Sequence, residues 1–293
     1  MAEALFVGVD GGASHTRARI RDAAGRCLGE GSAGPANTRL GLPAVMREIV
    51  AACRAAAAAA GLADSDLGRL HAGLGLAGAT NPGERERVLA QPLPFASVAA
   101  DSDAYVAWLG ACAGRDGAIL IVGTGSCGLA VIGGRRINVG GWGAVISDDG
   151  GGAVIGREAV RRALWALEGM APPSGLADAI LDDFQRDPEP AVAWAATAKP
   201  ADFARYVPTV FDWAARRDPL ALALLSEAGA AVGRMVTRLL ECGAPAVCLV
   251  GGLAGPIAPW LAPPLRAALV PPAADPIDGA ILLARRHADD GRI

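Results

Sequence analysis

One arrangement of apolar runs and glycine turns occurs twice along this chain. Residues 5–9 form an apolar run that ends at Asp10-Gly11-Gly12, and residues 118–122 form another that ends at Gly123-Thr124-Gly125-Ser126. Each turn is followed by two further strand patterns, near 16–20 and 26–28 in the first half and near 128–132 and 136–139 in the second. A three-stranded meander is therefore predicted in both halves.

The similarity continues after each meander. A helix and a strand are predicted at 43–60 and 70–76 in the first half, and at 220–240 and 247–250 in the second. Each half then closes with an Ala-Ala-Asp string before a helix, at 105–112 and at 281–287. Each half thus has the predicted order strand-strand-strand-helix-strand-helix-strand-helix, although glycine after an apolar strand also occurs in α/β proteins without duplication.

Residues 151–217 carry helical patterns at 154–167, 175–184 and 200–216 that have no counterpart in the first half. We expect them to be a helical insertion that enlarges the second domain. The predicted first domain covers 1–112 and is completed by a C-terminal helix at 280–293, and the larger second domain covers 113–279.

A single lysine, Lys199, stands among 27 basic residues in the 293-residue chain. It lies in Ala-Thr-Ala-Lys-Pro without a glycine loop before it, so P-loop NTPases and kinases that depend on a strand lysine are excluded. The formal net charge is -3 and no basic stripe is present, which argues against a nucleic-acid partner.

The six cysteines form no CxxC pair and only three histidines occur, so no zinc site is predicted. The first twelve residues lack the features of a secretory signal. Two long uncharged stretches, 117–134 and 242–265, are interrupted by glycines or prolines and are not expected to span a membrane. Free thiols in a reducing cytoplasm are the expectation.

The two glycine turns are candidate phosphate sites. Ligands of open α/β sheets gather at the carboxyl ends of strands, where tight glycine turns let backbone N–H groups approach a phosphate. Asp10 ends its strand before two glycines, so it could bind Mg²⁺ directly or through water. Ser14, Thr16, Thr124 and Ser126 add hydroxyl groups beside these turns.

Four motifs, in this order along the chain, resemble the phosphate-1, phosphate-2, sugar and adenosine motifs of the actin/hexokinase/Hsp70 (ASKHA) superfamily. They are Asp10-Gly11-Gly12-Ala13-Ser14, Gly123-Thr124-Gly125-Ser126, Gly140-Gly141-Trp142-Gly143 and Val250-Gly251-Gly252. Within that superfamily the chain resembles the BadF/BadG/BcrA/BcrD ATPase family, especially its N-acetylglucosamine kinase and glucosamine kinase members. The resemblance implies an α/β fold of duplicated ribonuclease H-like βββαβαβα domains with an interdomain cleft.

The resemblance also implies ATP-dependent transfer of the γ-phosphoryl group to the 6-hydroxyl of an amino sugar. Asp10 would hold Mg²⁺, and Asp103 would be the catalytic carboxylate. The sugar would contact Asn37, Asp103, Trp142, Gly143 and Asp148. ATP would contact Gly11, Gly12, Ser14, Thr124, Gly125, Ser126, Ala204, Gly251 and Gly252. The family resemblance further favours a homodimer.

Two positions depart from the family pattern. The chain has Gly12-Ala13-Ser14 where the family usually has Gly-Gly-Thr, which keeps a hydroxyl. It has Asp148-Asp149-Gly150 where the family usually has Asp-Glu-Gly, so one carboxylate is withdrawn by a methylene. The acceptor therefore stays open between N-acetylglucosamine, glucosamine and another hexose.

Each candidate residue also has a plainer interpretation. Asp101 or Asp103 could be only the N-cap of the helix that follows; we assign the cap to Asp101 and catalysis to Asp103. Asp148 and Asp149 could belong to the first turn of the next helix; we assign Asp148 to the sugar and Asp149 to a supporting position. Trp142 could be core and Asn37 a turn former.

Two other functions compete with a sugar kinase. An activator-type ATPase of the same family would need cysteines presented together for an iron–sulfur cluster, and Cys127 and Cys242 show no such pattern. A sugar-responsive repressor would carry an N-terminal DNA-binding helical module, whereas this chain begins with a strand pattern.

Overall fold

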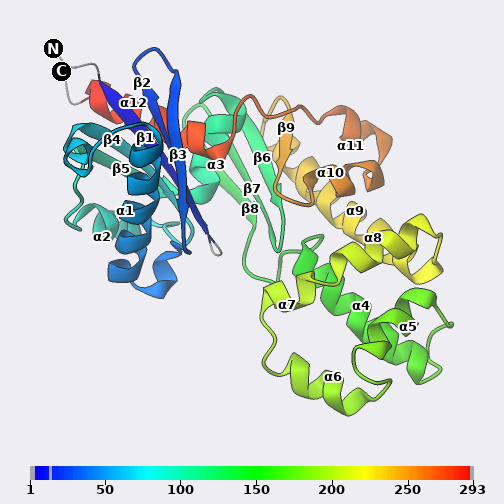
Figure 1. Ribbon diagram of the computed structural model, residues 1–293. Helices are drawn as coiled ribbons and strands as arrows, with labels where there is room; N and C mark the ends of the chain where they lie inside the picture. Colours follow the sequence, from blue (N-terminus) through cyan, green and yellow to red (C-terminus); the bar gives the residue numbers. More distant parts are fainter. Residues whose placement is uncertain (1–3, 13–14, 291–293) are drawn as a thin grey trace. The chain divides into compact units, whose positions relative to one another are not determined.

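The computed structural model describes residues 4–12 and 15–290. The chain forms two compact units, Met1–Asp116 with Pro271–Ile293 and Gly117–Val270. The predicted domains are 1–112 with 280–293, and 113–279. Each unit contains one β-sheet, and the elements of both are labelled in Figure 1.

The first unit is built on a five-stranded sheet in the order β3-β2-β1-β4-β5. β1 is antiparallel to β2 and β2 to β3, whereas β1, β4 and β5 run parallel. Parallel neighbours bring their carboxyl ends to one edge of the sheet. The strands are β1 (Leu5–Gly11), β2 (Thr16–Asp22), β3 (Cys27–Ala33), β4 (Leu70–Leu76) and β5 (Ser97–Ser102).

Helices cover both faces of this sheet. Val7 and Val9 of β1 pack in one apolar cluster with α1 (Leu42–Ala59). Since side chains alternate along a strand, Gly8 faces the other way, and a Cβ there would lie 2.3 Å from the Ile277 carbonyl oxygen of α12 (Pro276–Asp290). α12 also packs on α3 (Asp103–Cys112), and α2 (Pro82–Leu89) contacts β5. Two short 3₁₀ turns, η1 (Thr38–Leu40) and η2 (Asp64–Arg69), flank α1.

The second unit has a four-stranded sheet in the order β8-β7-β6-β9. Its strands are β6 (Gly117–Val122), β7 (Ser126–Ile132), β8 (Arg135–Gly140) and β9 (Val247–Val250). The predicted last strand of this half is wrong: the sheet gains only one parallel bridge, between Val247 and Leu269. Pro271 and Pro272 follow that bridge, and proline has no N–H to extend a ladder.

The inserted segment is helical, but its helices differ from the predicted ones. The single helix predicted at 200–216 is two helices that break at Arg205 and Tyr206, because Pro208 cannot donate the next helical hydrogen bond. An additional helix, α6, was not predicted. The insertion contains α4 (Gly152–Leu167), α5 (Gly175–Asp182), α6 (Pro188–Ala195), α7 (Pro200–Ala204) and α8 (Val207–Ala215).

The longest helix, α9 (Pro219–Glu241), packs against α8, α4 and the second sheet. Among the described residues it alone is long and apolar enough to cross a membrane by length and composition. Half of its apolar window is buried inside the protein. After β9 the chain makes three short helices, α10 (Ala254–Ile257), η3 (Ala258–Trp260) and α11 (Pro263–Ala267).

Candidate active site

The predicted site residues fall into two groups, one in each compact unit. In the first unit, the strand register aligns Asp10 of β1 with Gly75 of β4 and Asp101 of β5. Asp103 follows two residues later as the first residue of α3. A Cβ on Gly75 would lie 2.0 Å from Val106, so glycine lets α3 approach β4 closely. Asp10 and Asp103 are therefore delivered to one edge of the sheet.

Asp10 faces a cation on the neighbouring strand. Its Oδ2 lies 2.7 Å from an Nη of Arg17, and 18% of its side chain is exposed. Gly11 packs tightly, since a Cβ there would lie 2.7 Å from Leu76 and 3.0 Å from Ala36. The Gly12 N–H donates to the His15 carbonyl at 3.0 Å. The predicted phosphate ligand Ser14 lies outside the described residues.

The loop that carries Asn37 is fastened to the same edge. The Thr38 N–H donates to the carbonyl of Ala77, directly after β4, at 2.9 Å. Gly78 has φ +91°, and a Cβ there would lie 2.3 Å from the Thr38 hydroxyl oxygen. The Asn37 Oδ1 accepts from the Arg39 N–H at 3.0 Å, which is the turn-forming role considered above. Among the described residues its amide nitrogen has no partner, so it can still donate to a ligand.

The helix that begins at Asp103 is capped by Ser102. The Ser102 hydroxyl accepts from the Tyr105 N–H at 3.2 Å, so the predicted cap at Asp101 is wrong. Asp101 instead accepts from the Ser102 N–H at 2.8 Å and lies 3.8 Å from Arg85. It is the last-but-one residue of β5, in an extended segment, and serine at the next position already satisfies the helix donor.

The Asp103 carboxylate has the environment of a proton acceptor. It accepts a hydrogen bond from the Ala104 N–H at 2.8 Å. Burial raises the pKa of Asp103 above its usual value, the Ala104 hydrogen bond opposes this, and the negative charge of Asp10 raises it further. A carboxylate with a raised pKa is a better base than an exposed one.

In the second unit, the turn after β6 is fixed by the start of α4. The Gly123 N–H donates to the Gly125 carbonyl at 2.9 Å. The Gly152 N–H donates to the Gly123 carbonyl and the Ala153 N–H to the Thr124 carbonyl, both at 2.8 Å. A Cβ on Gly125 would lie 2.4 Å from the Asp148 carboxylate. The second glycine turn and Asp148 are therefore in direct proximity.

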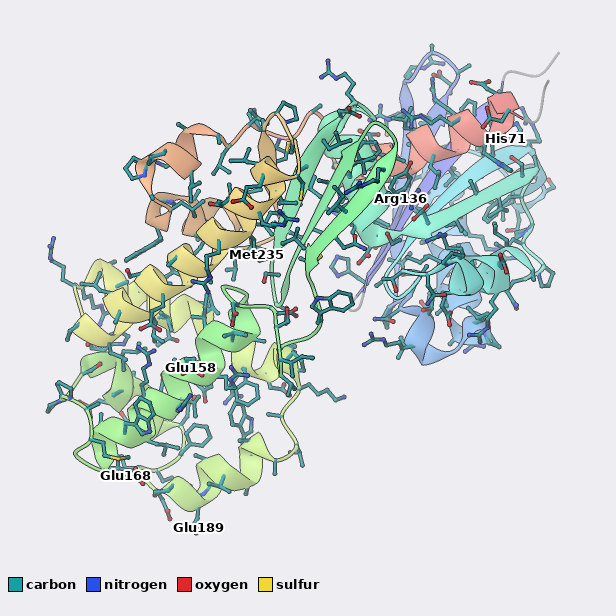
Figure 2. The ribbon with its side chains drawn as sticks, turned by 180° about the vertical axis from the view of Figure 1, so that it is seen from behind. His71, Arg136, Glu158, Glu168, Glu189 and Met235 are labelled. Atoms are coloured by element: carbon teal, nitrogen blue, oxygen red, sulfur yellow. The ribbon has the colours of Figure 1, made fainter. Side chains whose placement is uncertain are left out.

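The Ser126 hydroxyl holds the loop between β8 and α4. Ser126 is 3% exposed, and its hydroxyl donates to the Asp149 carbonyl at 2.9 Å. The same hydroxyl lies 3.7 Å from the sulfur of Met235 on α9, which is labelled in Figure 2. In this structure the hydroxyl orders the loop, and its predicted contact with a phosphate stays a prediction.

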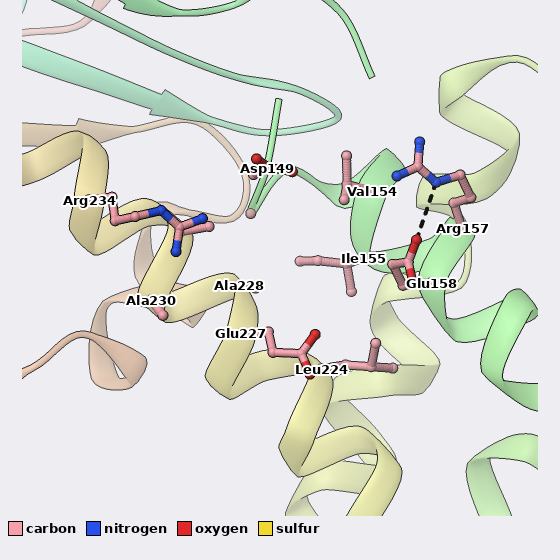
Figure 3. Close-up of a pocket in the computed structure, with 12 residues that line it drawn as sticks. Asp149, Val154, Ile155, Arg157, Glu158, Leu224, Glu227, Ala228, Ala230 and Arg234 are labelled. Carbon is pink, nitrogen blue, oxygen red and sulfur yellow. Dashed lines mark ion pairs between the residues drawn. The ribbon is translucent and has the colours of Figure 1, made fainter. Parts of the chain in front are cut away.

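Asp148 and Asp149 are adjacent but have different surroundings. Asp148 has φ +61°, and its Oδ1 accepts from the Gly143 N–H at 3.1 Å. Burial and the Asp149 charge raise the pKa of Asp148, and the Gly143 hydrogen bond opposes them. Asp149 instead lines a hollow of about 380 Å³ beside α4 and α9 (Figure 3). That hollow has an apolar wall and a charged rim that includes Arg157, Glu158, Glu227 and Arg234.

Trp142 is 72% exposed, so its interpretation as a core residue is wrong. Val145 and Ile146 in the same loop are 89% and 82% exposed. Gly143 has φ +98°, which a residue with a Cβ adopts rarely, and its N–H faces Asp148. This loop thus presents an indole ring a few residues from a partly buried carboxylate.

The last predicted residues surround the same turn. Gly251 has φ +100°, and a Cβ there would lie 2.5 Å from the carbonyl of Val122, the last residue of β6. Gly252 follows directly. The Ala204 Cβ would lie 3.2 Å from a Cβ on Gly152. The second unit therefore gathers its predicted nucleotide residues around the ends of β6 and β9.

The structure adds residues that the sequence patterns did not single out. Arg17 pairs with Asp10, and Gly78 supports the Asn37 loop. The pair depends on the β1–β2 register, which the predicted strand ranges 5–9 and 16–20 do not define. Within the described part of the chain, no three His, Cys, Asp or Glu side chains form a ready-made metal cluster.

Comparisons with known proteins identify relatives of this chain. A glucosamine kinase, GspK of Vibrio cholerae serotype O1, is 40% identical over 279 residues, which are 95% of each chain. A provisionally named N-acetylglucosamine kinase from Chromobacterium violaceum has a crystal structure with TM-score 0.89 and 35% identity, covering 96% of this chain and 99% of that one.

A more distant structure shows the fold alone. The ROK family glucokinase of Streptomyces griseus, in complex with glucose and AMPPNP, superposes with TM-score 0.56 at 20% identity over 96% of this chain and 99% of that one. Together with the two sheets, these matches confirm the predicted α/β class of duplicated domains. The family model of the BadF/BadG/BcrA/BcrD ATPases matches residues 7–284. The chain belongs to the BadF/BadG/BcrA/BcrD ATPase family.

Proposed function

We propose that this chain is an ATP-dependent amino sugar kinase that transfers the γ-phosphoryl group to the 6-hydroxyl of glucosamine or N-acetylglucosamine. The observation that carries the proposal is Asp103, a carboxylate with a raised pKa at the sheet edge that also carries Asp10. Similarity to a glucosamine kinase along nearly the whole chain supports it.

Phosphoryl transfer asks a protein mainly for positioning, charge neutralisation and a base for the acceptor hydroxyl. Asp103 is the proposed base: it would accept the proton of the 6-hydroxyl as the oxygen attacks the γ-phosphorus. The Ala104 N–H holds one oxygen of this carboxylate in place, at 2.8 Å. The neighbouring Asp10 charge favours uptake of that proton.

Asp10 is the proposed contact for Mg²⁺. Protein-bound Mg²⁺ keeps several waters and takes one or two carboxylates together with substrate phosphates, so a single aspartate at the end of β1 fits it. The ion, when bound, would neutralise phosphate charge. Asp10 itself would hold the ion, or one of its waters, at the edge that bears Asp103.

The nucleotide would be held by the two glycine turns. Gly11, Gly12 and Ser14 belong to the first unit, and Thr124, Gly125 and Ser126 to the second. Ala204, Gly251 and Gly252 lie around the second turn, where small residues leave room for a ribose and a base. Tight turns of this kind let the backbone come close to an anion.

The sugar would be recognised by hydroxyl acceptors, amide donors and one aromatic ring. The free Asn37 amide can donate to a hydroxyl, and Asp148 can accept from one. Trp142 is exposed and can stack on the apolar face of the ring. We propose glucosamine as the preferred acceptor, because the match to the Vibrio cholerae glucosamine kinase spans 95% of each chain.

We further propose a homodimer that acts in the cytoplasm.

The test is ADP release by the purified chain with ATP and Mg²⁺ over a panel of glucosamine, N-acetylglucosamine, glucose and no sugar. We expect turnover that depends on an amino sugar, with the highest kcat/KM for glucosamine. A basal ATPase activity that no sugar changes would contradict the kinase and favour the activator-type ATPase. Preference for glucose would favour another hexose kinase.

A further inference from the structure

Arg17 of β2 forms an ion pair with Asp10, the proposed metal-binding residue. It stands directly opposite Asp10 in the antiparallel β1–β2 register, and one Nη lies 2.7 Å from the Asp10 Oδ2. The Arg17 side chain is 45% exposed, whereas that of Asp10 is 18% exposed. The guanidinium therefore covers the carboxylate from the solvent side and keeps most of its own donors available.

The other arginines of β2 are fully engaged elsewhere. Arg19 contacts Glu30, Asp275 just before α12, and Asp278 on α12. Arg21 binds Asp278 at 2.7 Å and donates to the Gly25 carbonyl. These contacts fasten α12 to the sheet. Arg17 alone of the three points at the residues that carry the proposed chemistry. A guanidinium has five N–H donors, and one of its nitrogens suffices for the contact with Asp10.

One backbone donor of the first turn is already in use. The Gly12 N–H is already donated to the His15 carbonyl, so it is satisfied within the turn. The only lysine of the chain, Lys199, lies just before α7 in the second unit. A phosphate chain near Asp10 and Asp103 would add negative charge to two carboxylates, and Arg17 would supply positive charge there in addition to the proposed Mg²⁺.

We propose that Arg17 is a phosphate-binding residue of this chain: it pairs with Asp10 in the unliganded protein and donates its free N–H groups to a terminal phosphate of the bound nucleotide. The proposal rests on the proposed function for the identity of the ligand as a nucleoside triphosphate. Arginine suits this task because its planar fork matches two phosphate oxygens and it stays charged at all physiological pH values.

The first experiment measures ATP and AMP affinity by calorimetry on the full chain, in buffer with EDTA and in buffer with Mg²⁺. Arg17→Gln should weaken ATP binding about 10- to 100-fold, the usual loss for a hydrogen bond to a charged group. AMP binding should change less than twofold. Arg17→Lys keeps the charge without the fork and should recover part of the loss. Arg26→Gln, which removes an exposed arginine paired with Asp22, is the matched control.

A second variant separates direct phosphate contact from an effect through Asp10. In EDTA, Asp10→Asn removes a negative charge and releases Arg17, so ATP should bind several-fold more tightly than to the wild type. Adding Arg17→Gln in the Asp10→Asn background should still weaken ATP binding about tenfold or more. Because both charges of the pair are removed, the double variant should fold like the wild type. Circular dichroism checks this.

The outcomes distinguish this proposal from the proposed function. Equal ATP affinity of Arg17→Gln and the wild type, or no further loss in the Asp10→Asn background, overturns the role of Arg17 while the kinase stands. If Arg17→Gln loses ATP affinity but the wild type phosphorylates no amino sugar, the role of Arg17 is supported and the kinase is contradicted. A wild-type chain that binds no ATP overturns both.

Discussion

Replacing Asp103 by asparagine should remove the base and leave the site otherwise intact. Asparagine has the same shape and keeps an oxygen that can accept the Ala104 N–H, so the start of α3 should be preserved. Ser102 caps this helix independently of Asp103. A positioned general base contributes about 100- to 10,000-fold to a rate, or about 3–5 kcal/mol of transition-state stabilisation. We expect kcat to fall by that factor and the KM values of sugar and ATP to change less than threefold.

The assay is steady-state ADP release with glucosamine from pH 5 to 9. Burial first, and the Asp10 charge in addition, raise the pKa of Asp103, and the base acts only when deprotonated. The wild-type kcat should therefore fall as the pH drops through a pKa above the ordinary value of 3.8, and Asp103→Asn should lose this acidic limb. Asp64→Asn, on an exposed carboxylate paired with Arg54, is the control. Near-normal turnover of Asp103→Asn would refute the assignment.

Three further changes test other parts of the structure. Trp142→Ala should raise the sugar KM about two- to tenfold without lowering the melting temperature, because the indole is 72% exposed; Met170→Ala, at 65% exposure, should change neither. Gly279→Ala should destabilise the first unit by about 1–3 kcal/mol in urea unfolding, since its Cβ would lie 1.9 Å from the Val106 carbonyl oxygen, whereas Gly255→Ala meets nothing within 4 Å and should be neutral. Burial acts to raise the pKa of Asp278, but hydrogen bonds from Arg21 and Arg19 outweigh it, so the pKa is lowered. Ionised Asp278 therefore stabilises the fold above about pH 4, and this stabilisation is lost as the pH falls further. A melting temperature independent of pH between 5 and 2.5 would contradict this.

Strand positions were predictable because apolar runs in this chain end at glycine turns. The strands at Leu70–Leu76 and Val247–Val250 have the predicted bounds. The turn at Gly123 follows its strand as predicted, and its N–H donates to the Gly125 carbonyl at 2.9 Å. The first strand runs two residues further than predicted, to Gly11, because Asp10 and Gly11 still pair with Arg17 and Thr16 of β2.

The remaining differences arise from competition between neighbouring residues. Asp101 and Ser102 can both cap a helix, and the sequence does not show that α3 begins at Asp103, which makes Ser102 the residue in the cap position. The strand expected near the end of the second half is reduced to one bridge at Leu269, because Pro271 and Pro272 follow closely and cannot extend a ladder. Arg17 was missed because charge pairing across strands depends on register, which a single strand pattern does not define.

The central claim is that this chain phosphorylates an amino sugar on its 6-hydroxyl. The most direct measurement is phosphorus–proton correlation NMR of the product formed from glucosamine, ATP and Mg²⁺. We expect the phosphorus signal to couple to the two protons on carbon 6, and to appear only when both substrates are present. Coupling to the anomeric proton, or inorganic phosphate as the sole product, would contradict the claim.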